Sequence, residues 1–201
     1  MEAQVVKERS EPGDGELVAM TLRDRNCYGL IVGRYEAPLV RYVKRLLGTH
    51  GGAVDDVLQE AFIKAYVNLR AYDQTRPFPP WIYRIAHNEA VNYLRRRRVE
   101  PQMIDGEDGL FLLERLGGGS ELSAVIAAEE AEKRLAAGLR ELGDRYRDVL
   151  VLRFLEERSY SDISDILELP PGTVATLIRR GLKRLKAKLE STDHSAEHWM
   201  T

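Results

Sequence analysis

Apolar residues recur at steps of three and four along most of the chain, a spacing that places them on one face of an α-helix. In the stretch from Val57 to Leu69, for example, Leu58, Ala61 and Phe62 fall on a common face. No stretch alternates apolar and polar residues as a half-buried strand does. The pattern predicts an all-α fold with helices over residues 16–47 with a break, 53–72, 81–98, 121–142, 144–154, 159–167 and 173–189.

Two interruptions divide this helical pattern. Three prolines between Gln74 and Pro80 predict a loop. Residues 99–132 carry nine acidic residues against one basic residue and include a glycine triplet, which indicates a flexible acidic linker. The sequence therefore predicts two small helical domains, with a leader over 1–15, a first domain over 16–98, the linker over 99–121, a second domain over 122–190 and a tail over 191–201.

The last two predicted helices have the layout of a helix-turn-helix. Ser159 can cap the first of them, with Asp162 at the capping-box spacing, and Leu169 to Gly172 forms a tight break. One face of the second helix is apolar, and the opposite face is rich in basic residues. In a helix-turn-helix the second helix offers side chains to base edges and phosphates. The alternative is a basic, solvated helix in an ordinary bundle.

The helix predicted over 81–98 carries a polar face, which is the second surface of the chain that could contact nucleic acid. It ends in four consecutive arginines, and Phe78, Trp81 and Tyr83 lie at its start. Arginines interleaved with aromatic rings suit single-stranded nucleic acid, since phosphates take the charge and bases stack on the rings. Trp81 could equally be a core residue, but a helix dipole is too small to explain four arginines. The polar face comprises Arg84, His87, Asn88, Asn92, Arg95 and Arg98.

A third polar face lies on the helix predicted over 53–72. Asp56, Gln59 and Glu60 occupy steps zero, three and four, so they share one side of that helix. An acidic and amide face of this kind could dock on a basic partner surface. Acidic residues that favour a helix N-terminus are the alternative explanation.

Composition narrows the class of protein further. The net charge is −2, so a nucleic-acid surface must come from local clustering of charge. No nucleotide-binding glycine loop, catalytic constellation or metal-ligand spacing is present, and we expect no enzyme activity and no cofactor. The one cysteine, Cys27, cannot form an internal disulfide, and a buried structural thiol is the favoured interpretation. With no signal peptide and no membrane-spanning stretch, we expect a cytoplasmic protein.

Three segments in this order resemble the extracytoplasmic-function (ECF) sigma factors of bacterial RNA polymerase. DDVLQEAFIKAY resembles the segment that binds core polymerase, and FPPWIYRIAHNEAVNYLRRRR resembles the −10 recognition and melting segment. The segment from Asp144 to Leu189 resembles the −35 helix-turn-helix. The resemblance covers both predicted domains. It implies that core RNA polymerase and promoter DNA are partners, together with an anti-sigma factor.

The resemblance also implies a role for each face. Polymerase would be bound through the β′ clamp helices, by Asp56, Gln59 and Glu60, and through the β flap. The −10 element would contact the face of Arg84, His87, Asn88, Asn92, Arg95 and Arg98, and the loop from Gln74 to Pro80 would capture a flipped base. The −35 element would contact Thr173, Thr176, Arg179, Arg180 and Lys183. The acidic linker would pass through the polymerase cleft and mimic RNA.

The sequence departs from the family pattern at a few positions. Ala175, Thr176 and Leu177 stand where the family usually has a basic residue, Ser and Arg, and Asn92 stands where relatives often have Asp. The first of these departures shifts the expected −35 contacts toward Arg179, Arg180 and Lys183. Two alternatives stay open from the residues alone: a helix-turn-helix regulator that acts without polymerase, and a helical adaptor that binds only protein. Binding assays with duplex DNA and with core polymerase separate them.

Overall fold

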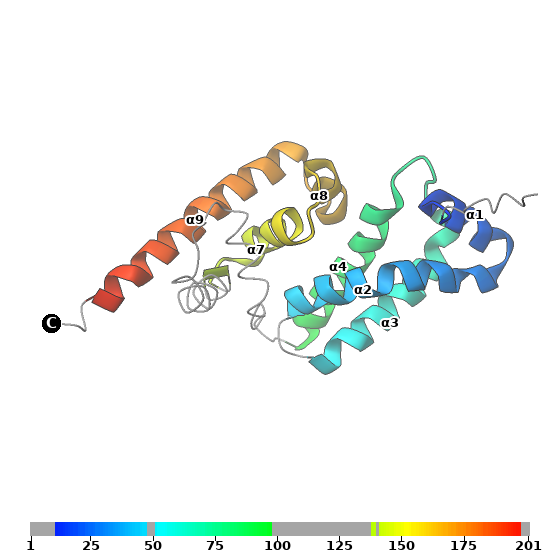
Figure 1. Cartoon of the computed structure of the whole chain (residues 1–201), viewed down its shortest axis with the longest axis horizontal. Coiled ribbons are helices and arrows are strands. Elements are labelled where there is room, and N and C mark those ends of the chain that lie inside the picture. The colour runs from blue at the N-terminus through cyan, green and yellow to red at the C-terminus, as the bar shows by residue number, and fades with distance from the viewer. Residues whose placement is uncertain (1–10, 48–50, 98–137, 140, 198–201) are drawn as a thin grey trace, which may run out of the picture.

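The computed structural model describes residues 11–47, 51–97, 138–139 and 141–197. All regular elements within these ranges are helical, which confirms the all-α fold class (Figure 1). The N-terminal part contains α1 (Asp14–Arg23), η1 (Arg25–Cys27), α2 (Tyr28–Leu47), α3 (Gly51–Asn68), η2 (Leu69–Ala71) and α4 (Phe78–Arg97). The C-terminal part contains α7 (Asp144–Leu150), η3 (Val151–Leu155), α8 (Tyr160–Leu167) and α9 (Pro171–Glu197). The expected linker lies outside the described residues.

The N-terminal domain is built on α2, α3 and α4, which pack against one another, with α1 against α2. Its core is aliphatic and aromatic, with Leu39 and Tyr42 of α2 and Ala86 of α4 fully buried. The break expected within residues 16–47 is confirmed. There the backbone of Asp24 is extended, and its carboxylate accepts a hydrogen bond from the Asn26 N–H at 3.0 Å.

The third helix begins earlier than the proline content predicted. Residues 74–80 were expected to form a loop, but α4 starts at Phe78 and holds Pro79 and Pro80 in its first turn. The prediction was wrong there because the first N–H groups of a helix have no intrahelical partner, so proline sacrifices no hydrogen bond at these positions. The remaining loop is ordered by Asp73, whose carboxylate accepts hydrogen bonds from the Thr75 N–H at 2.9 Å and hydroxyl at 2.7 Å.

In the C-terminal domain, α8 and α9 form the expected short helix, turn and long helix. The capping box of α8 is confirmed: Ser159 Oγ accepts from the Asp162 N–H at 3.0 Å, and the Asp162 carboxylate accepts from the Ser159 N–H at 3.2 Å. α8 ends at Glu168, whose left-handed backbone turns the chain toward α9. The helix expected over 144–154 is instead α7 followed by a π-helical turn, η3.

The last helix is longer than expected at both ends. It was predicted over 173–189, but α9 starts at Pro171 and continues to Glu197. Proline at the first helical position is favourable for the same reason as in α4. On the inner side of α9, Val174, Ile178 and Leu185 are buried. They pack on α7 and α8, so the basic side of the helix is left outward.

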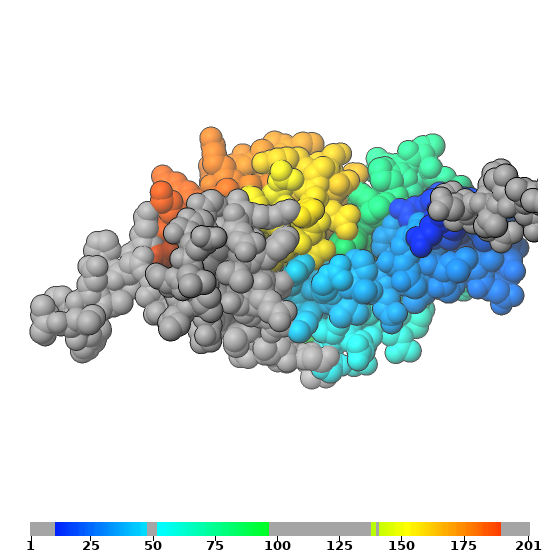
Figure 2. Space-filling model, viewed as in Figure 1, coloured from blue at the N-terminus to red at the C-terminus, as the bar shows by residue number. Residues whose placement is uncertain are grey.

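The two domains contact each other in this structure. α8 lies against α4, and Figure 2 shows the yellow C-terminal atoms resting on the blue and green N-terminal ones. Arg45 of α2 reaches across to donate to the Leu155 carbonyl at 3.4 Å and forms an ion pair with Glu156. Because α4 carries one of the expected DNA-binding faces, this contact affects what that face can bind.

Candidate functional site

The basic face of α9 is open to solvent. Arg179, Arg180 and Lys183 are exposed, on the side opposite Val174 and Ile178. Thr173 is exposed as well. Thr176 is half-buried, and its hydroxyl already donates to the Gly172 carbonyl at 2.8 Å. The structure therefore brings four of the five expected −35 residues together as an accessible surface at the N-terminal half of α9.

The polar face of α4 is divided between solvent and the other domain. Asn88 and Arg95 are exposed, and Asn92 is half-buried, with its side-chain oxygen accepting from Arg95 at 2.8 Å. Arg84 is 29% exposed and pairs with Glu168 of the C-terminal domain at 3.6 Å. Arg98 lies outside the described residues. The exposed members of this face can present amide and guanidinium donors to nucleic acid.

His87 does not lie on this open face, contrary to the expectation from sequence. Its ring is buried, and its Nδ1 shares a hydrogen bond with the Tyr42 hydroxyl at 2.9 Å. Burial, and secondarily the nearby Arg147 guanidinium, lowers the pKa of His87 to about 4. A buried, neutral imidazole cannot reach a phosphate or a base, so we correct the assignment of His87 to the DNA-binding face in this conformation.

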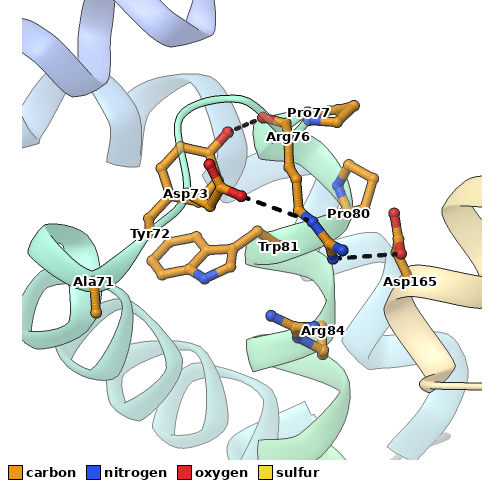
Figure 3. Close-up of a pocket in the computed structure, with 9 residues that line it drawn as sticks. All are labelled: Ala71, Tyr72, Asp73, Arg76, Pro77, Pro80, Trp81, Arg84 and Asp165. Atoms are coloured by element: carbon orange, nitrogen blue, oxygen red, sulfur yellow. Dashed lines mark hydrogen bonds and ion pairs between the residues drawn. The ribbon is translucent and has the colours of Figure 1, made fainter.

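A pocket of about 310 Å³ opens beside the start of α4 (Figure 3). Its walls combine aromatic rings with cations: the rings of Tyr72 and Trp81 lie 5.1 Å apart, and Arg76 and Arg84 line the pocket with them. Trp81 lines this pocket rather than being fully buried in the core. An aromatic wall beside guanidinium groups can stack an unpaired base and neutralise its phosphate. The pocket includes the loop to which the family resemblance assigns base capture.

The acidic face of α3 is fully exposed. Asp56, Gln59 and Glu60 all point to solvent, and Glu60 makes a long ion pair with Lys64 at 3.7 Å. Lys64 also binds the buried carboxylate of Glu89 at 2.7 Å. That second ion pair ties α3 to α4 and holds this face in place.

Sequence reasoning missed an apolar extension of the α3 face. Ile63 is 51% exposed and Val67 70% exposed, one and two turns beyond Gln59. Beside them a groove of about 700 Å³ is lined by Ile63, Tyr66 and Tyr28. The sequence contained a signal for this surface: residues 59, 63 and 67 are four apart, so they share one face of α3, away from its buried stripe. Apolar groups gathered on a surface indicate a protein-binding site.

Several charged groups are buried where the domains meet. The Tyr83 hydroxyl donates to the Glu156 carboxylate at 3.0 Å, and the Arg158 guanidinium lies 4.0 Å from the centre of the Tyr83 ring. Burial raises the pKa of Tyr83 to about 12. Nearby, burial raises the pKa of Asp148 to about 6, partly offset by Arg147.

Within the described ranges, no group of three or more His, Cys, Asp or Glu side chains is placed to hold a metal ion. None of the helices described there combines the length and the apolar character that crossing a membrane requires. Cys27 is a free thiol of intermediate exposure, so it is less buried than the sequence suggested.

Comparison with known proteins identifies the family of the two domains. The chain matches the family models for Sigma-70 region 2 over residues 31–100 and for Sigma-70 region 4 over residues 132–185. It is 32% identical over 170 residues to the ECF RNA polymerase sigma factor SigW of Bacillus subtilis, covering 83% of this chain and 90% of that protein.

Two solved structures share the fold. CnrH, in complex with the cytosolic domain of CnrY, matches with a TM-score of 0.63 and 24% identity, covering 89% of this chain and 97% of CnrH. The sigma factor RpoE of Bartonella quintana, in complex with the anti-sigma factor NepR, matches with a TM-score of 0.52 and 19% identity, covering 76% of this chain and 91% of RpoE.

Two helical domains that match regions 2 and 4 define a protein of the sigma-70 class. Within that class, the sequence identity to SigW and the share of both chains that the match covers assign the family. The chain belongs to the family of ECF RNA polymerase sigma factors.

Proposed function

We propose that this protein is a sigma factor that binds core RNA polymerase, recognises −35 and −10 promoter elements and starts transcription of a specific regulon. The observation that carries the proposal is the presence of three separate faces on a chain of this family. One is acidic and apolar on α3, one is a cationic and aromatic pocket with the amide face of α4, and one is basic on α9. A regulator that acts without polymerase has no need of the first face.

The α3 face is proposed to dock on the β′ clamp helices of polymerase. Its exposed carboxylates, Asp56 and Glu60, suit a basic partner surface. The adjoining Ile63 and Val67 supply apolar area that water would otherwise cover. Charge then sets the register of the complex, and apolar burial adds affinity.

The pocket and the exposed face of α4 are proposed to read and open the −10 element. Arg84, Asn88 and Asn92 lie one helical turn apart and can follow one strand of DNA. The aromatic wall at Trp81 offers a stacking surface to a base that has left the duplex. Unstacking a base costs a few kcal/mol, so a pocket that stacks it again favours the open state.

The outward side of α9 is proposed to bind the −35 element as duplex. Arg179, Arg180 and Lys183 would contact phosphates and base edges in the major groove. Thr173 is placed near the start of α9, where base contacts concentrate in a helix-turn-helix.

Three further proposals follow from the sequence and its relatives. The nine carboxylates of residues 99–132 would act as an RNA mimic in the polymerase cleft. An anti-sigma factor would regulate the chain, as one binds the structurally similar RpoE. We also propose that the chain works in the cytoplasm and has no catalytic activity of its own, since polymerase performs the chemistry.

The proposed function is tested by transcription in vitro with purified core polymerase on a library of genomic promoter fragments. We expect the full chain to direct initiation from a small set of fragments that share two spaced elements. Core polymerase alone is the control for initiation at fragment ends. Binding to duplex DNA with no dependence of transcription on the chain would favour the polymerase-independent regulator.

A further inference from the structure

The start of α9, from Pro171 through Ile178, carries no charged side chain. It contains only proline, glycine, threonine, valine, alanine, leucine and isoleucine, and the cations of the helix begin at Arg179. In a helix-turn-helix, the N-terminal residues of the second helix are the ones that contact base edges. The part of α9 that is proposed to reach the bases of the −35 element therefore offers them no guanidinium or ammonium group.

Thr176 lies at the centre of the outward side of this segment. At about 100° per residue it is nearly opposite Val174, which is buried. It stands one turn beyond Gly172, which has no side chain that could shield it. Arg179 and Arg180 are exposed and follow it by three and four residues, so they flank it on the same side of the helix. The chemistry of the Thr176 side chain therefore decides what this side of α9 can recognise.

The hydroxyl group of Thr176 is already engaged within the helix. It donates to the Gly172 carbonyl at 2.8 Å, the bond that a helical threonine makes to the carbonyl four residues back. A hydroxyl group has one proton, so Thr176 has no donor left for the O6 or N7 atoms of guanine. Its side chain offers DNA the γ-methyl group and an oxygen atom that can only accept.

The side chains on either side of Thr176 add no hydrogen-bond donor. Ala175 is exposed, and its side chain is a single methyl group. Leu177 is half-buried and packs partly against the core. Among the four bases, thymine alone presents a methyl group in the major groove, and alanine and threonine methyl groups make favourable contacts with it. The start of α9 is thus suited to thymine and not to guanine.

We propose that Thr176, with Ala175 beside it, determines the −35 specificity of this chain by contacting thymine methyl groups in the major groove. The inference rests on the proposed function of the α9 face. Arg179, Arg180 and Lys183 then serve mainly to bind phosphates, contacts that position the helix but carry no sequence information. The −35 element would have A·T pairs at the positions that face the start of α9.

The first test selects DNA with holoenzyme assembled from core polymerase and the full chain. The probe is a library of random-sequence duplexes long enough to hold both promoter elements, and bound molecules are sequenced after several rounds. We expect thymine to be enriched in the upstream element. Repeating the selection with Ala175→Lys should add guanine there, because lysine donates to guanine O6 and N7. An upstream element without enriched thymine would overturn the inference and leave the proposed function standing, whereas no enrichment over core polymerase alone would overturn both.

The second test removes single methyl groups from the selected DNA. Deoxyuridine replaces thymine at one position of the upstream element at a time, and the affinity of holoenzyme is measured by fluorescence anisotropy. With the unaltered chain we expect one position at which affinity falls about fourfold, the value of one buried methyl group. The Thr176→Ser variant keeps the hydroxyl group but lacks the methyl group, so it should show no fall at that position.

The matched control is Thr176→Val, which keeps the methyl group and lacks the hydroxyl group. Its affinity should fall on deoxyuridine substitution as that of the unaltered chain does. Deoxyuridine in the spacer between the two elements should leave the affinity of all three proteins unchanged. Equal falls for Thr176→Ser and the unaltered chain, or no fall at any position of the upstream element, would overturn the inference.

Discussion

His87 and Asp148 are both buried, and burial lowers the pKa of His87 but raises the pKa of Asp148. Two single variants, each lacking one of these groups, should therefore show opposite dependences of stability on pH. The pKa of Asp148 rises from its ordinary 3.8 to about 6, mainly through burial. The folded state therefore binds this proton more tightly than the unfolded state, and lowering the pH through 6 stabilises the fold. The pKa of His87 falls from 6.5 to about 4, also mainly through burial. Here the unfolded state binds the proton more tightly, so lowering the pH below 6.5 destabilises the fold.

The two contributions oppose each other between pH 4 and 6.5, so single substitutions should reveal each one. On going from pH 7 to pH 5, protonation of Asp148 raises the free energy of unfolding by about 1 kcal/mol. Over the same range His87 is protonated in the unfolded state but stays neutral in the folded state, which lowers the free energy of unfolding by about 2 kcal/mol. An Asp148→Asn variant retains only the histidine effect and should lose stability at pH 5. A His87→Asn variant retains only the aspartate effect and should gain stability. Asn carries both a donor and an acceptor, so it can keep the hydrogen bond with Tyr42.

Urea unfolding at constant ionic strength, followed by circular dichroism at pH 7 and pH 5, measures this directly. Groups that titrate elsewhere in the chain are common to both variants, so they cancel in the comparison. The free energy of unfolding of the two variants should diverge by about 3 kcal/mol between these pH values. Parallel pH dependences in the two variants would show that the burial argument is incorrect for this pair.

Three other predictions concern the polymerase face, the linker and helix packing. Asp56→Lys with Glu60→Lys should weaken binding to core polymerase by several kcal/mol with helicity unchanged; fluorescence anisotropy that shows unaltered affinity would contradict the docking face. Replacing the linker carboxylates with Gln and Ser should leave promoter binding nearly intact and change the ratio of abortive to full-length RNA; an unchanged ratio would favour a plain tether. Gly33→Ala should stabilise α2 by up to about 1 kcal/mol, because a Cβ there meets open space. Gly181→Ala should stabilise less in thermal unfolding, since its Cβ would lie 3.3 Å from Leu150; equal gains would argue against tight packing of α9 on α7.

Local features of the fold were predictable where one mechanism dominates. The capping box at Ser159 follows from side-chain hydrogen bonds within a few residues, and it is present. A break within residues 16–47 was predicted without a position, and the structure has it at Asp24. The proline-rich start of α4 was wrongly predicted because proline disfavours a helix interior but suits its first turn. Sequence spacing alone does not say which of these two positions a proline occupies.

The candidate site was less predictable because parts of it depend on contacts between domains. Helical spacing placed His87 on the polar face of α4, yet its ring is buried beside Tyr42 and close enough to Arg147 of the C-terminal domain to be affected by its charge. Arg84 was correctly placed beside Asn88, but nothing in the local pattern could reveal its pairing with Glu168, far along the chain. The apolar groups at Ile63 and Val67 were visible as a second stripe on α3, and interpreting them as an exposed face required knowing what α2 and α4 cover.

The central claim is that, in a polymerase-bound sigma factor, the α9 face binds the −35 element and the α4 face opens the −10 element. Permanganate footprinting of unpaired thymines tests this claim most directly. Holoenzyme is assembled with core polymerase and the chain, and gel-shift titrations are run beside it on a promoter that the chain selects. Alanine at Arg179 or Arg180 should weaken initial binding and lower the salt dependence by about one ion for each phosphate that the variant no longer neutralises. Alanine at Asn88 or Asn92 should spare initial binding and reduce thymine reactivity or alter −10 choice. Normal melting with an unaltered −10 preference in the Asn88 and Asn92 variants would contradict the account.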